Sequence, residues 1–126
     1  PKNKIIEMEK KKTGKLFSFC CAAPAIIKIK SNSEIKFFEN IGLNIGLLFQ
    51  IADDLIDFKG DSKKAGKKTG KDQKKGKATL IRLLGYKNAI KYCDKIIIDI
   101  NKNLKKYGSN SKNIRETLDY ILNRDK

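Results

Sequence analysis

Three aspartates interrupt an apolar run in the middle of the chain. Between Leu47 and Phe58 the sequence reads LLFQIADDLIDF, in which Asp53, Asp54 and Asp57 stand among leucine, isoleucine and phenylalanine. An unpaired carboxylate inside a protein core is costly, or it takes up a proton. The run must therefore fold so that its carboxylates and its apolar side chains occupy different faces, as they do on a helix.

Helical geometry gathers the polar residues of this run. Because each residue of an α-helix advances by about 100°, four side chains share one narrow arc: Gln50, Asp53, Asp54 and Asp57. Asp53 and Asp57 lie one turn apart, near enough to share a hydrated cation. The chain contains no histidine, and oxygen ligands alone favour Mg²⁺ over Zn²⁺. The alternative is a solvated helix face whose aspartates pair with surface lysines.

Helical spacing extends over most of the chain. Apolar residues recur with this spacing in five segments, expected to be helices at about 3–23, 33–58, 78–85, 87–107 and 113–124. Pro24 is expected to end the first helix, and Ser33 to cap the second. Gly108 is a stop signal for the fourth helix, and Asn113 and Glu116 have the spacing of a capping box. Without a convincing strand or repeat, the prediction is an all-α bundle or part of one.

Two of these helices carry residues that ordinary packing does not require. In the first helix, Lys12 stands on a stripe of otherwise apolar residues: Ile5, Met8, Leu16, Phe19 and Ala23. In the second helix, Gly42 and Gly46 cost about 1 kcal/mol each relative to alanine. These glycines either let another helix approach closely or leave room for a ligand.

Residues 59–77 are rich in lysine and glycine. Their sequence, KGDSKKAGKKTGKDQKKGK, predicts a loop rather than a packed helix. Glycines let backbone N–H groups approach an anion, and lysines supply positive charge. The alternative is a solvated lysine tract. A P-loop is excluded, because GxxxxGK[ST] is absent and no strand precedes the segment.

The formal net charge of +15 arises from 29 lysines and arginines against 14 acidic residues. Such an excess indicates an anionic partner, unless it reflects a compositional bias toward lysine, isoleucine and asparagine. Nucleic acid is one candidate. However, residues 59–77 contain no aromatic residue for base stacking and no arginine for bidentate recognition.

Cysteine and histidine usage excludes several kinds of site. Three cysteines without a CxxC pair or histidine argue against zinc, and the absence of histidine excludes histidine-based catalysis. We expect reduced cysteines in a cytoplasmic protein. The apolar stretch at 16–27 is too short to span a membrane. Because the chain begins with Pro1, we expect it to be part of a longer protein.

Four stretches together resemble the trans-polyprenyl diphosphate synthase family. GLLFQIADDLIDFKGD resembles its second aspartate-rich motif, with an FQxxDDxxD core, and KKTGKLF is similar to the KTG element on an earlier helix. GKKTGKDQKKGKAT is similar to a GKxxGxD segment followed by GKxT. The tail, LDYILNRDK, resembles the last helix of bacterial farnesyl diphosphate synthases. The four elements stand in the family's order and cover nearly the whole chain.

This resemblance implies a fold and a reaction. Residues 1–126 would be the C-terminal part of an isoprenoid-synthase helix bundle, with an active-site loop at about 59–77. The enzyme would join dimethylallyl or geranyl diphosphate to isopentenyl diphosphate by Mg²⁺-assisted ionisation, releasing pyrophosphate. A first aspartate-rich motif and the isopentenyl diphosphate pocket would lie upstream of Pro1. We therefore expect the chain alone to be inactive and the full-length protein to be a homodimer.

The resemblance also implies roles for single residues. Asp53, Asp54 and Asp57 would bind Mg²⁺ directly or through water. Three lysines would contact the allylic diphosphate: Lys12, Lys67 and Lys77. The oxygens of Thr13 and Gln50 would stabilise the nascent allylic cation. Two other functions remain open at this point, a non-catalytic prenyltransferase-like subunit and a basic helical module that binds nucleic acid.

Overall fold

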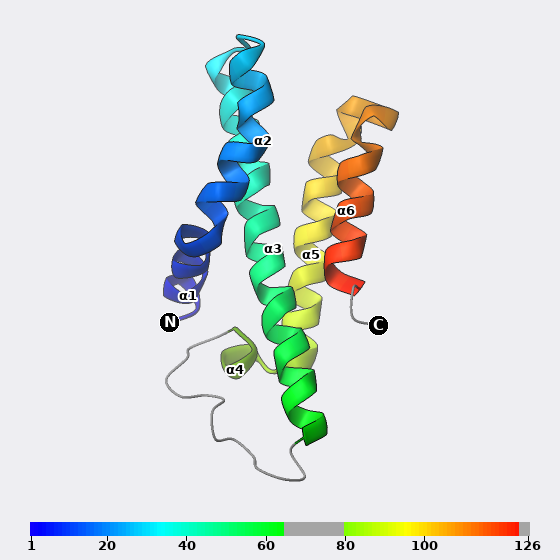
Figure 1. Ribbon diagram of the computed structural model, residues 1–126. Coiled ribbons are helices and arrows are strands. Elements are labelled where there is room, and N and C mark those ends of the chain that lie inside the picture. The colour runs from blue at the N-terminus through cyan, green and yellow to red at the C-terminus, as the bar shows by residue number, and fades with distance from the viewer. Residues whose placement is uncertain (65–79, 124–126) are drawn as a thin grey trace.

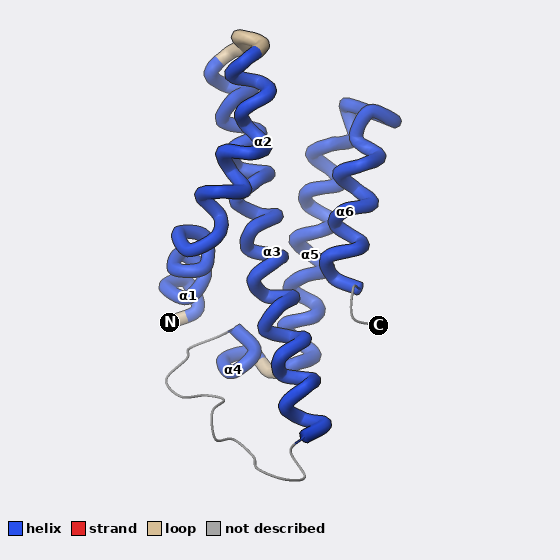
Figure 2. The backbone as a smooth tube through the Cα atoms, viewed as in Figure 1, coloured by secondary structure: helices blue, strands red, loops and turns tan. Residues whose placement is uncertain are grey.

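The computed structural model describes residues 1–64 and 80–123. In chain order the elements are α1 (Lys2–Glu9), a π-helical turn η1 (Lys10–Gly14), α2 (Lys15–Ile27), α3 (Asn32–Lys64), α4 (Leu80–Leu84), α5 (Tyr86–Leu104), a 3-10 segment η2 (Lys105–Ser111) and α6 (Lys112–Asn123). Figure 2 shows only helices and connecting loops in these two ranges. The predicted all-α fold is confirmed.

The long helix α3 is the centre of the arrangement (Figure 1). On one side, α1, η1 and α2 run along it, and α2 joins it through a short turn to form an antiparallel pair. On the other side, α5 and α6 form a second antiparallel pair that packs against it. Because helices pack against both sides of α3, the side chains that α3 carries on each side are held in fixed relative positions.

The core lies between α3 and the helices that follow it. Its largest fully buried side chains are Leu47, Leu48, Ile51, Leu80, Cys93, Ile100, Leu104 and Leu118. Burying a leucine or isoleucine side chain stabilises a fold by about 1.5–3 kcal/mol. Because α3, α4, α5 and α6 all contribute to this cluster, the middle of α3 is anchored where the aspartates begin.

Two glycines bring the backbones of α2 and α3 together. A Cβ atom added at Gly42 would overlap the carbonyl oxygen of Phe17 and the Cα atom of Ser18. A Cβ atom at Gly46 would lie 2.7 Å from the Cα atom of Gly14. Backbone atoms of the neighbouring segment fill the space at both positions. Of the two predicted alternatives, close helix packing or room for a ligand, close packing is therefore correct.

The prediction that Pro24 ends the first helix was wrong. Helix α2 continues through Pro24 to Ile27, and the carbonyl of Pro24 accepts the backbone N–H of Lys28 at 3.0 Å. Pro24 is exposed, whereas its neighbours Ala22 and Ala25 are buried. Proline removes one backbone hydrogen bond near the end of the helix, and packing of the two alanines maintains the helical path.

Both ends of α3 differ from the prediction. Ser31, rather than Ser33, caps the helix, because the side-chain oxygen of Ser31 accepts the backbone N–H of Glu34 at 3.2 Å. At the other end α3 continues to Lys64, so residues 59–64 of the predicted loop are helical. The rest of that loop, from residue 65, lies outside the described residues.

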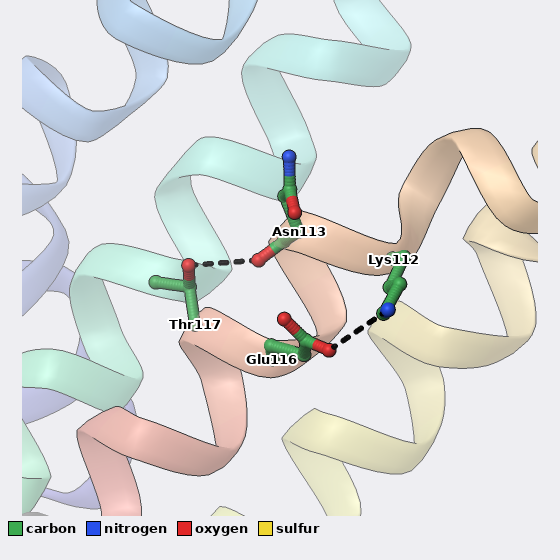
Figure 3. A network of polar contacts seen from close by, with 4 residues as sticks. All are labelled: Lys112, Asn113, Glu116 and Thr117. Atoms are coloured by element: carbon green, nitrogen blue, oxygen red, sulfur yellow. Dashed lines mark hydrogen bonds and ion pairs between the residues drawn. The ribbon is translucent and has the colours of Figure 1, made fainter.

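The start of α6 also differs in detail. Gly108 does interrupt the chain after α5, with a φ of 56° that favours glycine. The predicted capping box is absent, because Asn113 lies inside α6. Figure 3 shows the contacts present at this end of α6: Lys112 and Glu116 form an ion pair at 3.8 Å, and Thr117 donates to the Asn113 carbonyl at 2.8 Å.

The apolar stripe predicted for the first helix does not face the core. Leu16 is 67% exposed and Phe19 is 65% exposed, and only Ile5 of the stripe is buried. The face of α2 that meets α3 instead carries Ala22 and Ala25. Lys12 is exposed as well, and so it stands on a solvent-facing apolar stripe. Within residues 1–64 and 80–123, no helix is long and apolar enough to cross a membrane.

Candidate active site

The carboxylates of α3 are more exposed than the apolar residues between them. Gln50, Asp53 and Asp54 are half-buried, and Asp57 is exposed. The apolar residues between them, such as Ile51 and Leu55, are buried in the core. The predicted separation of polar and apolar faces is therefore present, and the helix presents these polar side chains from an anchored backbone.

Thr13 meets Gln50 across the contact between η1 and α3. The Oγ1 atom of Thr13 donates to the Oε1 atom of Gln50 at 2.8 Å, although 37 positions separate the two residues. This is an ordinary length for an O–H···O hydrogen bond. The KTG element and the aspartate-rich helix are thus joined directly, next to the turn of α3 that carries Asp53.

The KTG element lies within a π-helical turn. Residues Lys10–Gly14 form this turn, in which Thr13 is half-buried, Gly14 is buried and Lys12 is exposed. Single π-helical turns are uncommon inside helices and are often found at functional sites. The turn directs Thr13 toward α3 and leaves the neighbouring Lys12 in solvent.

Two phenylalanines close in sequence to Thr13 and Gln50, which were not predicted as site residues, pair with each other between α2 and α3. The rings of Phe17 and Phe49 lie 5.5 Å apart between centroids. Phe17 follows Thr13 by four residues, and Phe49 precedes Gln50 directly. The sequence offered one signal for Phe17, which is that its spacing from Thr13 places both residues on the same side of a helix. The Phe17–Phe49 contact thus joins residues that are close in sequence to Thr13 and Gln50.

Glu9 was also missed by the sequence analysis. It is 4% exposed, which is uncommon for a carboxylate, and it lies one turn before Thr13. No sequence signal singles it out, because EKKK reads as a solvated stretch. Glu9 is therefore a buried carboxylate one turn before the KTG element.

Asp53, Asp54 and Asp57 are carboxylate donors of the kind that Mg²⁺ prefers in proteins. Residues 1–64 and 80–123 hold no group of three or more acidic, cysteine or histidine side chains arranged around a metal position. Asp53 and Asp57 lie one turn apart and offer carboxylate oxygens, which suit Mg²⁺ when waters or phosphate oxygens complete its shell. The donor chemistry therefore fits Mg²⁺, with further ligands required from elsewhere. Lys67 and Lys77 lie outside the described residues.

The cysteines do not form a metal site. Cys20 is exposed, Cys21 is half-buried and Cys93 is buried, and all three are free. Burial raises the pKa of the Cys93 thiol to about 12, and the neighbouring charge of Asp94 adds to the shift. Burial also raises the pKa of Cys21, with a smaller effect of Cys20. Cys93 is therefore a small apolar residue of the core, whereas Cys20 is exposed.

A groove of about 530 Å³ lies elsewhere on the molecule. Apolar residues of α3, α5 and α6 line it, among them Ile56, Ile97 and Leu122. Gln50, Asp53 and Asp57 are absent from its described lining. The candidate active site is therefore the open polar surface formed by η1 and α3.

Comparison with known proteins identifies the family. The family model for polyprenyl synthetase matches residues 2–121. The chain is 35% identical over 103 residues to a geranylgeranyl diphosphate synthase of Saccharolobus solfataricus, covering 80% of this chain and 31% of that protein. It is 29% identical over 124 residues to a farnesyl diphosphate synthase of Micrococcus luteus, covering 98% of this chain and 43% of that protein.

A solved structure shows the same arrangement of helices. The crystal structure of a geranyltransferase from Helicobacter pylori 26695 matches 97% of this chain and 38% of its own, with a TM-score of 0.68 and 24% identity. The chain thus spans about a third to two fifths of the length of these relatives. With its all-α fold and the family model matched over nearly its whole length, the chain belongs to the polyprenyl synthetase family.

Proposed function

We propose that this chain is the C-terminal part of a trans-prenyltransferase that joins an allylic diphosphate to isopentenyl diphosphate. The observation that carries the proposal is the hydrogen bond between Thr13 and Gln50 beside the aspartates of α3. It places two oxygen-bearing neutral side chains next to carboxylates that suit Mg²⁺. Family membership and the names of the relatives support the same class of reaction.

The carboxylates of α3 serve the diphosphate end of the substrate in this proposal. Asp53 and Asp57 would hold Mg²⁺, with Asp54 binding directly or through water. Bound Mg²⁺ neutralises negative charge on the diphosphate leaving group. Lys12 stands exposed near the start of this surface and would add a cationic contact to the diphosphate, as would Lys67 and Lys77.

Thr13 and Gln50 serve the carbon end of the substrate. The single hydroxyl hydrogen of Thr13 is donated to Gln50, so that Oγ1 can offer only lone pairs to a further group. Oxygen lone pairs held in place stabilise positive charge that develops as the C–O bond breaks. Phe17 and Phe49 provide an apolar boundary beside them. We also propose that the full-length protein is a homodimer.

Calorimetric titration tests this function. The ligand is a thiodiphosphate analogue of dimethylallyl diphosphate that does not ionise, added with and without Mg²⁺. We expect binding that requires Mg²⁺ and that weakens about tenfold or more in Asp53→Asn, because a charge-assisted contact contributes about 1.5–3 kcal/mol. Asp99→Asn removes an exposed carboxylate from α5 and should bind as the unmodified chain does.

Two results would contradict the proposal. Binding without any need for Mg²⁺, or equal weakening by Asp53→Asn and Asp99→Asn, would show that the α3 carboxylates have no specific role. Tight nucleic-acid binding that is insensitive to Asp53→Asn and falls steeply with salt would support a basic binding module instead.

A further inference from the structure

Gly14 and Gly46 touch each other directly beside the Thr13–Gln50 pair. A Cβ atom added at Gly46 would lie 2.7 Å from the Cα atom of Gly14 and 3.2 Å from its backbone nitrogen. Both glycines are buried. The contact is therefore one of backbone against backbone, which leaves no flexible side chain to move aside.

The two positions do not respond equally to an added methyl group. A Cβ atom at Gly14 would lie 3.1 Å from the Cδ2 atom of Leu43, and this atom is the end of a rotatable side chain. At Gly46 the obstacle is the backbone of η1 itself. Alanine at position 46 must therefore push the π-helical turn away from α3, whereas alanine at position 14 does so only while the Leu43 side chain stays in place.

Such a displacement of the π-helical turn would also lengthen the hydrogen bond between Thr13 and Gln50. Thr13 precedes Gly14 directly, and Gln50 lies one helical turn after Gly46. The added Cβ atom would lie 2.7 Å from the Cα atom of Gly14, whereas an ordinary separation is about 3.5–4.0 Å. The π-helical turn must therefore move away from α3 by about 1 Å. The same shift would lengthen the 2.8 Å bond between Thr13 and Gln50 beyond the range of an O–H···O hydrogen bond.

We infer that Gly46 is a positioning residue, whose backbone contact with Gly14 sets the separation at which Thr13 donates to Gln50. The inference rests on the proposed function for the role of the pair, and on geometry alone for its position. Gly46 touches no substrate. It fixes the orientation of the Thr13 hydroxyl, which leaves Oγ1 as an acceptor toward a positive charge.

NMR of the 126-residue chain tests the positioning without any ligand. The readout is the resonance pair of the Gln50 side-chain amide, with Thr13→Val as the reference for a broken bond. We expect Gly46→Ala to move these resonances to their Thr13→Val positions. Gly60→Ala is the matched control, because Gly60 also lies inside α3 but an added Cβ atom meets nothing within 4 Å. It should leave the Gln50 resonances unchanged.

A rescue experiment covers the case in which Gly46→Ala does not fold. Gly14→Ala should disturb the Gln50 resonances, and adding Leu43→Ala should restore them by removing the one side-chain obstacle. Unchanged Gln50 resonances in a folded Gly46→Ala, or the absence of rescue at Gly14, would overturn the inference.

A ligand measurement then tests the role of the pair. We compare the affinities of an ammonium-bearing allylic diphosphate analogue and of its neutral counterpart. Gly46→Ala should lower the preference for the cationic analogue by about tenfold, the effect of one lost contact to a charge, with Gly60→Ala unchanged. An unchanged preference in Gly46→Ala would overturn the inference. Failure of the unmodified chain to bind either analogue would overturn the proposed function, while the NMR result would still decide the positioning.

Discussion

At the scale of single residues, burial determines what each cysteine can do. Cys93 has no exposed surface in the core, and burial raises its pKa to about 12 from 9.0. Cys20 is exposed on α2. A thiolate is the reactive form of cysteine, so Cys93 is held in the unreactive thiol form while the fold is intact.

This pKa shift predicts a pH dependence of stability. In the unfolded chain Cys93 loses its proton near pH 9, whereas in the folded chain it keeps it to about pH 12. Its contribution to stability is therefore complete below pH 9 and is lost as the pH rises toward 12, with a slope approaching about 1.4 kcal/mol per pH unit. Urea unfolding at several pH values measures this slope.

Two variants separate this effect from the titration of lysines. Cys93→Ala should remove the Cys93 component, so that the difference in unfolding free energy between the two proteins shrinks as the pH rises. Cys20→Ala removes an exposed thiol and should retain the slope of the unmodified chain. A difference between the Cys93→Ala variant and the unmodified chain that stays constant from pH 9 to 12 would contradict the account.

At the scale of elements, short side-chain contacts fix where helices begin. Ser31 accepts the N–H of Glu34, while Ser33, two residues later, lies inside the first turn of α3. We expect Ser31→Ala to lower the free energy of unfolding by about 0.5–2 kcal/mol, because a backbone N–H loses its partner. Chemical denaturation compares it with Ser33→Ala, which should change stability by less than about 0.5 kcal/mol. Equal losses in the two variants would reject Ser31 as the cap.

The elements also show how much of the fold the sequence predicted. The periodicity of apolar residues correctly predicted the all-α fold and placed the polar arc of α3 on one face. The predicted helix ends at Pro24 and before residue 59 were wrong. Proline and glycine signal a break at these positions, but each helix continues. Local signals report the preference of a residue, and at Pro24 the packing of Ala22 and Ala25 overrides it.

The candidate site was predictable to a similar degree. Gln50 and the aspartates follow from helical geometry, because they are close in sequence. The contact between Gly14 and Gly46 and the bond from Thr13 to Gln50 join positions more than 30 residues apart. Single-chain periodicity carries no information on such pairs. Periodicity also does not reveal which face of α2 is buried, since small alanines rather than Leu16 and Phe19 are buried.

At the scale of the whole molecule, the chain holds one aspartate-rich motif on one long helix. With that motif alone, a bound diphosphate would meet aspartates from one helix only. We therefore expect no prenyl product when the 126-residue chain is incubated with Mg²⁺, dimethylallyl diphosphate and isopentenyl diphosphate, as followed by chromatography of the dephosphorylated lipids. Product formation above that of an Asp53→Asn control would contradict this prediction.

The central claim is that η1 and the middle of α3 form one side of a metal–diphosphate site. Paramagnetic broadening by Mn²⁺, used in place of Mg²⁺ with the thiodiphosphate analogue, tests it most directly. We expect the backbone signals of residues 50–57 and of Lys12 and Thr13 to broaden first, and only when the analogue is present. Broadening centred on the acidic residues of α5 and α6, Asp94, Asp99 and Asp119, or independent of the analogue, would contradict it.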